Sequence, residues 1–218
     1  MKRSALFVLS LCLGLGGVIS PTPNDETDAV IEYYWNKADS AFKPRDPVTA
    51  GLVYKMVAAT YHKHIGKNGR IVKIDSATSA YYCHAGQIDS QQVISGNGSR
   101  FADIDLTFTS AFDLDYHHFS FPNDTGGAAL AIGLETDSGS TNPNGLIVLD
   151  RYSYLPLALY LFYPGKQGYN SFSRSFRFTE VDGYIFPDSI WEVGSREGVF
   201  SRENYRLETS ISSIVIQH

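Results

Sequence analysis

The fold is decided by a stretch in the C-terminal third of the chain, residues 172–193, which reads FSRSFRFTEVDGYIFPDSIWEV. Two runs rich in aromatic and β-branched residues, 172–181 and 184–193, flank the dipeptide Asp182-Gly183. Strand-forming runs separated by a short turn of this kind are typical of a β-hairpin. The stretch therefore predicts two antiparallel strands joined by a tight turn.

The strand pattern continues on both sides of this hairpin, at residues 146–150, 155–163 and 199–216. The last run alternates. Its apolar set is Val199, Tyr205, Leu207, Thr209 and Ile211, and its polar set is Arg202, Asn204, Arg206, Glu208 and Ser210. This alternation predicts one buried and one solvated face. The run 155–163 differs, because Leu155, Leu157, Leu159 and Leu161 share one face while Ala158, Tyr160 and Phe162 share the other. We expect that strand to be apolar on both sides.

The earlier part of the chain also predicts strands. A hairpin is expected from residues 52–65 and 70–75, with Lys67, Asn68 and Gly69 as the turn, because Asn-Gly supplies two positive φ angles. Further strands are expected at residues 79–85, 91–94, 104–108 and 117–121. The polar stretches 122–127 and 136–145 are interpreted as loops, since they are rich in Gly, Ser, Asn and Asp.

One helix precedes these strands, at residues 24–42, with Asn24 as its candidate N-cap. Its apolar residues recur at helical spacing and are Ile31, Tyr34, Trp35, Ala38 and Phe42. Pro44 and Pro47 end it. The stripe must be buried, and the strands that follow predict that it covers a sheet.

The first twenty residues have the pattern of a cleaved signal peptide, with Lys2 and Arg3 before an apolar run that is too short and too rich in glycine for a membrane anchor. Lipidation at Cys12 is the alternative, disfavoured because the bulky Leu11 precedes it. The chain carries 18 basic and 23 acidic residues, and loss of the signal leaves 16 against 23, a net charge of −7. An acidic chain with scattered basic residues argues against nucleic-acid binding. Residues 21–218 are expected to form a single domain.

The number of cysteines indicates the cellular compartment in which the protein is found. Cys83 is the only cysteine outside the predicted signal, so no internal disulfide can form. Small proteins exported to the oxidising exterior tend to rely on disulfides. We therefore expect a periplasmic protein, with secretion as the alternative.

The C-terminal residues resemble a known family. Leu149-Asp150 is followed by Leu155-Pro156-Leu157, and later by 181–187, which reads VDGYIFP. This arrangement resembles the periplasmic lipoprotein-sorting carriers of the LolA and LolB type and their uncharacterised relatives, over residues 145–216. The resemblance implies a mainly β (α+β) fold, in which a single curved antiparallel sheet forms an incomplete β-barrel and an N-terminal amphipathic helix covers it.

The resemblance also implies that an apolar concave face holds acyl chains. The residues that we expect to line such a cavity are Trp35, Leu157, Leu159, Leu161, Phe176, Phe178, Trp191, Tyr205 and Leu207. The leading hypothesis is an exported envelope protein that binds a lipid or an acylated protein partner, with no catalytic residue, metal or cofactor. The arginine that the lipoprotein carriers use for ligand release has no identifiable counterpart, so a relative with a different ligand is expected.

Two alternatives come from other classes. The first is a non-catalytic scaffold or envelope-assembly domain that binds a protein partner. The second is a metal-dependent enzyme, which needs three of the histidines 62, 64, 84, 117 and 118 to converge. Simple polarity of exposed strands and loops is the favoured explanation of these histidines. The Asp-Thr/Ser-Gly stretches at Asp124 and Asp137 match aspartic proteases, but turn chemistry explains them better.

Overall fold

The computed structural model describes residues 25–97, 111–113, 116–120, 127–137, 140, 142–164, 169–197 and 202–217. Its helical elements are α2 (Asp25–Phe42), and the short 3-10 helices η1 (Lys43–Arg45) and η3 (Ala111–Asp113). Its strands are β1 (Val53–Ile65), β2 (Ile71–His84), β3 (Gln87–Gly96), β4 (His117–Ser120), β5 (Ala129–Glu135), β6 (Asn144–Asp150), β7 (Pro156–Tyr163), β8 (Ser171–Val181), β9 (Tyr184–Glu197) and β10 (Arg202–Gln217).

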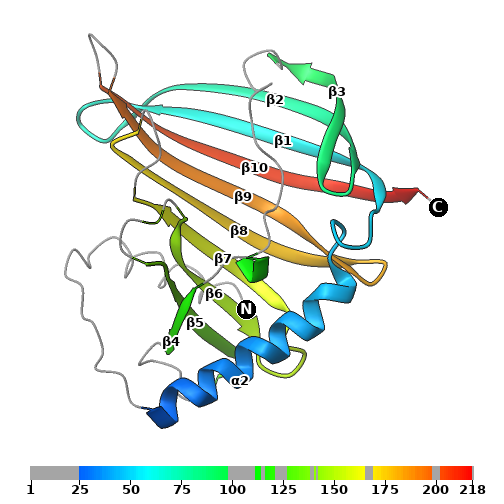
Figure 1. Cartoon of the computed structure of the whole chain (residues 1–218). Coiled ribbons are helices and arrows are strands. Elements are labelled where there is room, and N and C mark those ends of the chain that lie inside the picture. Colours follow the sequence, from blue (N-terminus) through cyan, green and yellow to red (C-terminus); the bar gives the residue numbers. More distant parts are fainter. Residues whose placement is uncertain are drawn as a thin grey trace.

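The described strands form one antiparallel sheet in the order β3-β2-β1-β10-β9-β8-β7-β6-β5-β4. Neighbours in the sheet are neighbours in sequence except at one place, where the last strand, β10, pairs with β1. The edges β3 and β4 lie at opposite ends of the order, so these strands do not close into a barrel (Figure 1). The predicted mainly β fold with one open, curved antiparallel sheet is confirmed.

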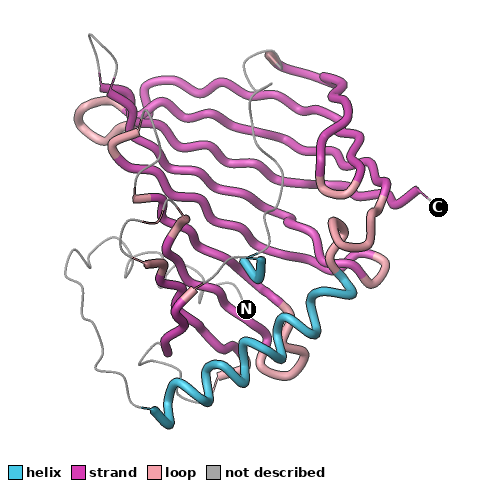
Figure 2. The backbone as a smooth tube through the Cα atoms, viewed as in Figure 1, coloured by secondary structure: helices cyan, strands magenta, loops and turns pink. Residues whose placement is uncertain are grey.

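The helix lies along the β4 to β8 part of the sheet (Figures 1 and 2). Ile31, Trp35, Ala38 and Phe42 follow one another at intervals of three and four residues, and all four are buried in the main core. The Phe112 ring of η3 packs 4.6 Å from the Trp35 ring. The helix therefore covers the sheet with the stripe that the sequence predicts. None of the described helices is long and apolar enough to cross a membrane.

The two sequence-predicted hairpin turns differ in geometry. Asp182 and Gly183 have φ angles of 51° and 85°, so both adopt the left-handed conformation that a two-residue hairpin needs. In the other turn only Gly69 has a positive φ, 75°, and the chain closes through a bond from the Gly66 amide to the Arg70 carbonyl. The turn at Lys67, Asn68 and Gly69 is present, but the expectation of two positive φ angles there is wrong.

Several strand boundaries also differ from expectation. The two short strands expected at 70–75 and 79–85 are one continuous strand, β2, and β5 falls where no element is expected. On β7, Leu157 is 41% exposed instead of sharing the face of Leu159, because the pairing with β6 slips between Val148 and Leu149 and places an extra residue there. The expected strand at 104–108 and the Asn24 cap lie outside the described residues.

Candidate functional site on the concave face

The concave face of the sheet has two chemically distinct areas. The first, which we call the apolar part, lies beside α2 and consists of Met56, Ile132, Ile147, Leu159, Phe176, Phe178, Phe186 and Ile190. The second, which we call the polar end, consists of His62, His64, Asp75, Arg174, Glu192, Glu203 and Tyr205. A hydrogen bond of 3.1 Å between the hydroxyl groups of Thr60 and Thr209 lies between them. One face of one sheet therefore changes from apolar to charged along its strands.

The apolar part is filled by side chains. All eight of its residues are at most 8% exposed. The pocket found beside it, between the start of β1 and the β8–β9 turn, has a cavity of ≈ 10 Å³ and is lined by Pro47, Val48, Tyr54, Met56, Gly86, Phe186, Pro187 and Ile214. A volume of that size holds about one water molecule. Among the described residues, the apolar part is thus closed in this conformation.

The nine side chains that the sequence places in the cavity separate into three groups. Trp35, Leu159, Leu161, Phe176 and Phe178 lie in the main core under α2. Tyr205 and Leu207 lie on the same face but form a second cluster with Ala77. Leu157 is exposed, and Trp191 lies between Ile190 and Glu192, which places it on the opposite, convex face. Six of the nine therefore lie on the concave face of the sheet, Trp35 packs against that face from α2, and Leu157 and Trp191 do neither.

Cys83 faces the apolar part and is 1% exposed. Burial raises the pKa of its thiol to about 11, because the apolar surroundings disfavour the thiolate. His84 is exposed on the other side of β2, as the alternation of a strand predicts. Cys83 is therefore a packing residue that the neighbouring His84 cannot activate.

The polar end contains a buried ion pair between neighbouring strands. Arg174 of β8 donates from Nη2 to Oε1 of Glu192 of β9 at 2.7 Å, and the two side chains are only 8% and 11% exposed. The guanidinium also lies 5.6 Å from the centre of the Phe172 ring. Removing one member of such a pair leaves a charge in a place with little access to water. Each charge therefore depends strongly on the other.

Aromatic rings extend the polar end. The Tyr205 hydroxyl donates to the Tyr169 hydroxyl at 3.3 Å, and the Arg196 guanidinium lies over both rings, at 4.3 Å from Tyr169 and 5.6 Å from Tyr205. Burial raises the pKa of Tyr205 to about 12. Gly194 makes this arrangement possible, since a Cβ there would lie 2.6 Å from the Tyr205 ring. The absence of a side chain on β9 thus lets the ring lie across the strand.

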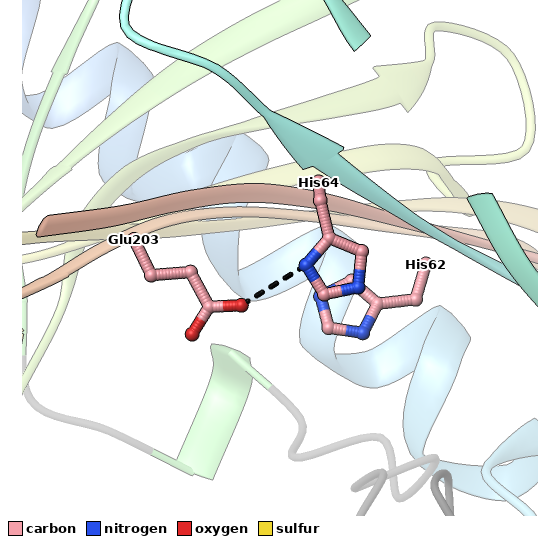
Figure 3. A group of neighbouring side chains, drawn as sticks. All are labelled: His62, His64 and Glu203. Carbon is pink, nitrogen blue, oxygen red and sulfur yellow. Dashed lines mark ion pairs between the residues drawn. The ribbon is translucent and has the colours of Figure 1, made fainter. Parts of the chain in front are cut away.

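Two histidines from β1 meet a glutamate from β10 at the end of the concave face (Figure 3). The His62 and His64 rings stack at a centroid distance of 4.3 Å, which confirms that they share a face. His64 Nδ1 lies 3.2 Å from Oε1 of Glu203, and His64 Nε2 lies 3.2 Å from Oδ2 of Asp75. Burial and the neighbouring His64 lower the pKa of His62. The cluster therefore combines two imidazoles with two carboxylates.

The other histidines lie elsewhere. His84 is at the opposite end of β2, and His117 is an exposed side chain whose Nε2 lies 2.8 Å from Oδ1 of Asp137. The hydrogen bond and charge of Asp137 raise the pKa of His117. The side chain of His118 and residue Asp124 lie outside the described part of the chain. Among the histidine side chains that the structure describes, no three converge, so these side chains do not form the centre that the metal-dependent enzyme hypothesis requires.

The sequence interpretation missed the charged residues of the polar end. By strand alternation Arg174 lies on the same face as Phe172 and Phe176, and Glu192 lies on the same face as Ile190. Each is therefore a charged residue at a position expected to face the core. That mismatch was the available signal. For Glu203 the sequence holds none, because its proximity to His64 follows only from the pairing of β1 with β10.

Comparison with known proteins gives no sequence match, either to a family model or to a curated protein. Solved structures do match. An outer membrane lipoprotein-sorting protein domain from Vibrio parahaemolyticus is 16% identical, covers 86% of this chain and 93% of its own, and has a TM-score of 0.44. A DUF1329 family protein from Desulfovibrio piger is 13% identical, with coverages of 85% and 92% and a TM-score of 0.40.

A third structure is the Pseudomonas aeruginosa MucA/MucB complex, which is 8% identical, covers 87% of this chain and 99% of its own, and has a TM-score of 0.27. At these identities and TM-scores, none of the three assigns a function to this chain.

Proposed function

We propose that this chain is an exported envelope protein that binds a lipid, or the acyl chain of a lipid-modified protein, on the apolar part of its concave face. The proposal rests on the combination of that apolar face with a single helix, α2, that covers it. The helix α2 contributes the side chains Ile31, Trp35, Ala38 and Phe42, and its other face is open to solvent, with Val30 and Tyr33 54% and 53% exposed. Binding needs no catalytic group.

Closure of the apolar part is compatible with this function, because a ligand-free carrier must keep such a surface out of water. Acyl binding then requires α2 to move aside. A chain of about 14 methylenes contributes about 11 kcal/mol at about 0.8 kcal/mol each, whereas exposing Ile31, Trp35 and Phe42 costs about 1.5–3 kcal/mol per side chain. The exchange of helix for ligand is therefore energetically feasible.

The first experiment is mass spectrometry of organic extracts of the natively purified protein. We expect a stoichiometric lipid or acylated species. The delipidated protein should then bind a fluorescent fatty acid saturably. If no lipid is carried and no probe binds, the carrier proposal fails.

A pair of α2 variants tests the role of the helix. Trp35→Ala should weaken the cover and raise the affinity for the fluorescent fatty acid, because the closed state competes with the ligand. Val30→Ala is the matched control, since Val30 lies on the exposed face of the same helix. Both variants should keep the cooperative thermal unfolding of the parent. Equal probe affinity in the two variants would contradict a helix that moves aside.

A protein-binding scaffold is the second candidate, favoured by exposed apolar side chains at the β1–β2 hairpin. Ile71, Val72 and Ile74 are 52%, 68% and 54% exposed. An exposed group of this kind is typical of a contact surface. The scaffold would be favoured if the purified protein carries no lipid but co-purifies with an envelope protein. That partner should be lost on Val72→Asp and kept on Lys67→Asp in the adjacent turn.

A further inference from the structure

The side chains of His62, His64 and Glu203 present two imidazole nitrogens and a carboxylate oxygen that all lie within 4.8 Å of one another. Two histidines and one carboxylate form a ligand set that binds divalent first-row transition metals and leaves coordination positions for water. Tetrahedral Zn²⁺ at about 2.0–2.1 Å places its ligand atoms about 3.3 Å apart. Bringing the three ligand atoms from separations of up to 4.8 Å to this distance requires shifts of about 1 Å. Rotation of a histidine ring or of the glutamate side chain can supply such shifts.

The position of His64 between two carboxylates points to a cation. One ring nitrogen faces Asp75 and the other faces Glu203, both at 3.2 Å. A neutral imidazole has only one N–H to donate, so one of its nitrogens would meet a carboxylate lone pair to lone pair. A metal ion between Nδ1 and Glu203 removes that conflict, with Nε2–H donating to Asp75. Metal-binding histidines commonly donate their other N–H to a carboxylate in this way.

The neighbouring strands hold the histidines in place. His62 is paired with Asp75 of β2 on one side and with Leu207 of β10 on the other, and His64 lies between Lys73 and Tyr205. The Tyr205 ring contacts His62 edge-on at a centroid distance of 5.3 Å. Lys73 is directed to Asp75, at 2.7 Å, which is the carboxylate that would not bind the metal. The two proposed histidine ligands thus come from a strand that is paired on both sides.

From this geometry we propose that His62, His64 and Glu203 bind one divalent transition-metal ion of the Zn²⁺ class, with Asp75 as a positioning residue that orients His64. The site lies at the polar end, away from the surface covered by α2. The proposal is therefore independent of lipid binding. Imidazole ligands favour zinc, cobalt, nickel and copper over magnesium and calcium.

The test is calorimetric titration of the full protein with ZnCl₂, after purification without a polyhistidine tag and dialysis against a chelator. We expect saturable binding of one Zn²⁺ per chain, with no comparable binding of MgCl₂. His62→Ala and His64→Ala should each weaken binding by at least about tenfold, and Asp75→Asn by about 10- to 100-fold. His84→Ala is the matched control and should bind like the parent, since His84 is an exposed histidine at the other end of β2.

Glu203→Gln keeps the test valid if a histidine variant fails to fold. The Glu203 side chain is 46% exposed, so the substitution should leave thermal unfolding unchanged while weakening Zn²⁺ binding by at least about tenfold. Titration with CoCl₂ should give the intense visible absorption of a four-coordinate site in the parent and lose it in this variant. Absence of saturable Zn²⁺ binding, or binding that the histidine and Glu203 variants leave unchanged, would overturn the proposal.

Discussion

The apolar part and the polar end of the concave face both include residues of β1, β8 and β9, but their side chains are held in place by different interactions. In the apolar part, α2 and the sheet bury aliphatic and aromatic side chains against one another. At the polar end, charges on adjacent strands satisfy one another, as Arg174 does with Glu192. Apolar packing has no directional requirement, whereas paired charges require specific partners. The polar end should therefore respond to single substitutions more specifically than the apolar part.

The largest effect is expected from breaking the buried ion pair. Glu192→Leu should lower the free energy of unfolding by about 3–5 kcal/mol, because Arg174 then keeps a buried charge without its carboxylate. The double variant Arg174→Met/Glu192→Leu should recover most of that loss, since it removes both charges. Urea unfolding of the two variants checks this. A double variant as unstable as the single one would show that the two side chains stabilise the fold by contacts other than the neutralisation of each other's charge.

In the apolar part a truncation should cost somewhat less. Leu159 is fully buried and lies opposite Phe176 on β8. Leu159→Ala should lower the free energy of unfolding by about 3 kcal/mol, through lost burial and the cavity that remains. Leu157→Ala is the matched control on the same strand, and its 41% exposed side chain should cost far less. Equal losses in urea unfolding would contradict the assignment of Leu157 to the outside of the core.

The contrast between these two leucines also shows which strand faces could be predicted from the sequence alone. Strict alternation predicted Leu157 and Leu159 on one face, and this failed because a slip in pairing cannot be recognised from one strand. Alternation succeeded for Tyr205, Leu207, Thr209 and Ile211 of β10, which are all buried. It was silent on β5, a strand of 7 residues that contains Gly133 and lies between two polar stretches of the sequence.

The candidate sites show the same division. The side chains that pack under α2 could be predicted because helical and strand periodicity report which face is dry. His62 and His64 could be placed together because they are two residues apart on a strand. Glu203 could not be added, since only the pairing of β1 with β10 brings residues so distant in sequence into contact. The polar end is thus a property of the sheet order, which no local pattern encodes.

A smaller effect is expected where the polar end depends on the absence of a side chain. Gly194→Ala places a Cβ 2.6 Å from the Tyr205 ring, which packs against His62 and Tyr169 and has little room to retreat. We expect a loss of about 1–3 kcal/mol in the free energy of unfolding, as for other overpacked sites. Adding Tyr205→Leu should return part of it. If Gly194→Ala unfolds in urea like the parent, the ring is free to move and the polar end is less rigid than the apolar part.

The smallest effect on stability should come from ionisation of the Cys83 thiol in the apolar part, and it is absent at neutral pH. Burial holds its thiol pKa at about 11, above the ordinary value of 9.0, so at pH 8 the folded protein should react with a thiol reagent about 100-fold more slowly than the unfolded chain. Because the unfolded thiol loses its proton first, the contribution of Cys83 to stability is complete below about pH 9 and declines as the pH rises to about 11. Cys83→Ala should lose less stability than the parent between about pH 9 and 10 in urea unfolding, below the range in which the raised pKa of Tyr205 adds a decline of its own. A native thiol that reacts rapidly at pH 8 would instead mean that the apolar part opens to water often, which is the motion that acyl binding under α2 requires.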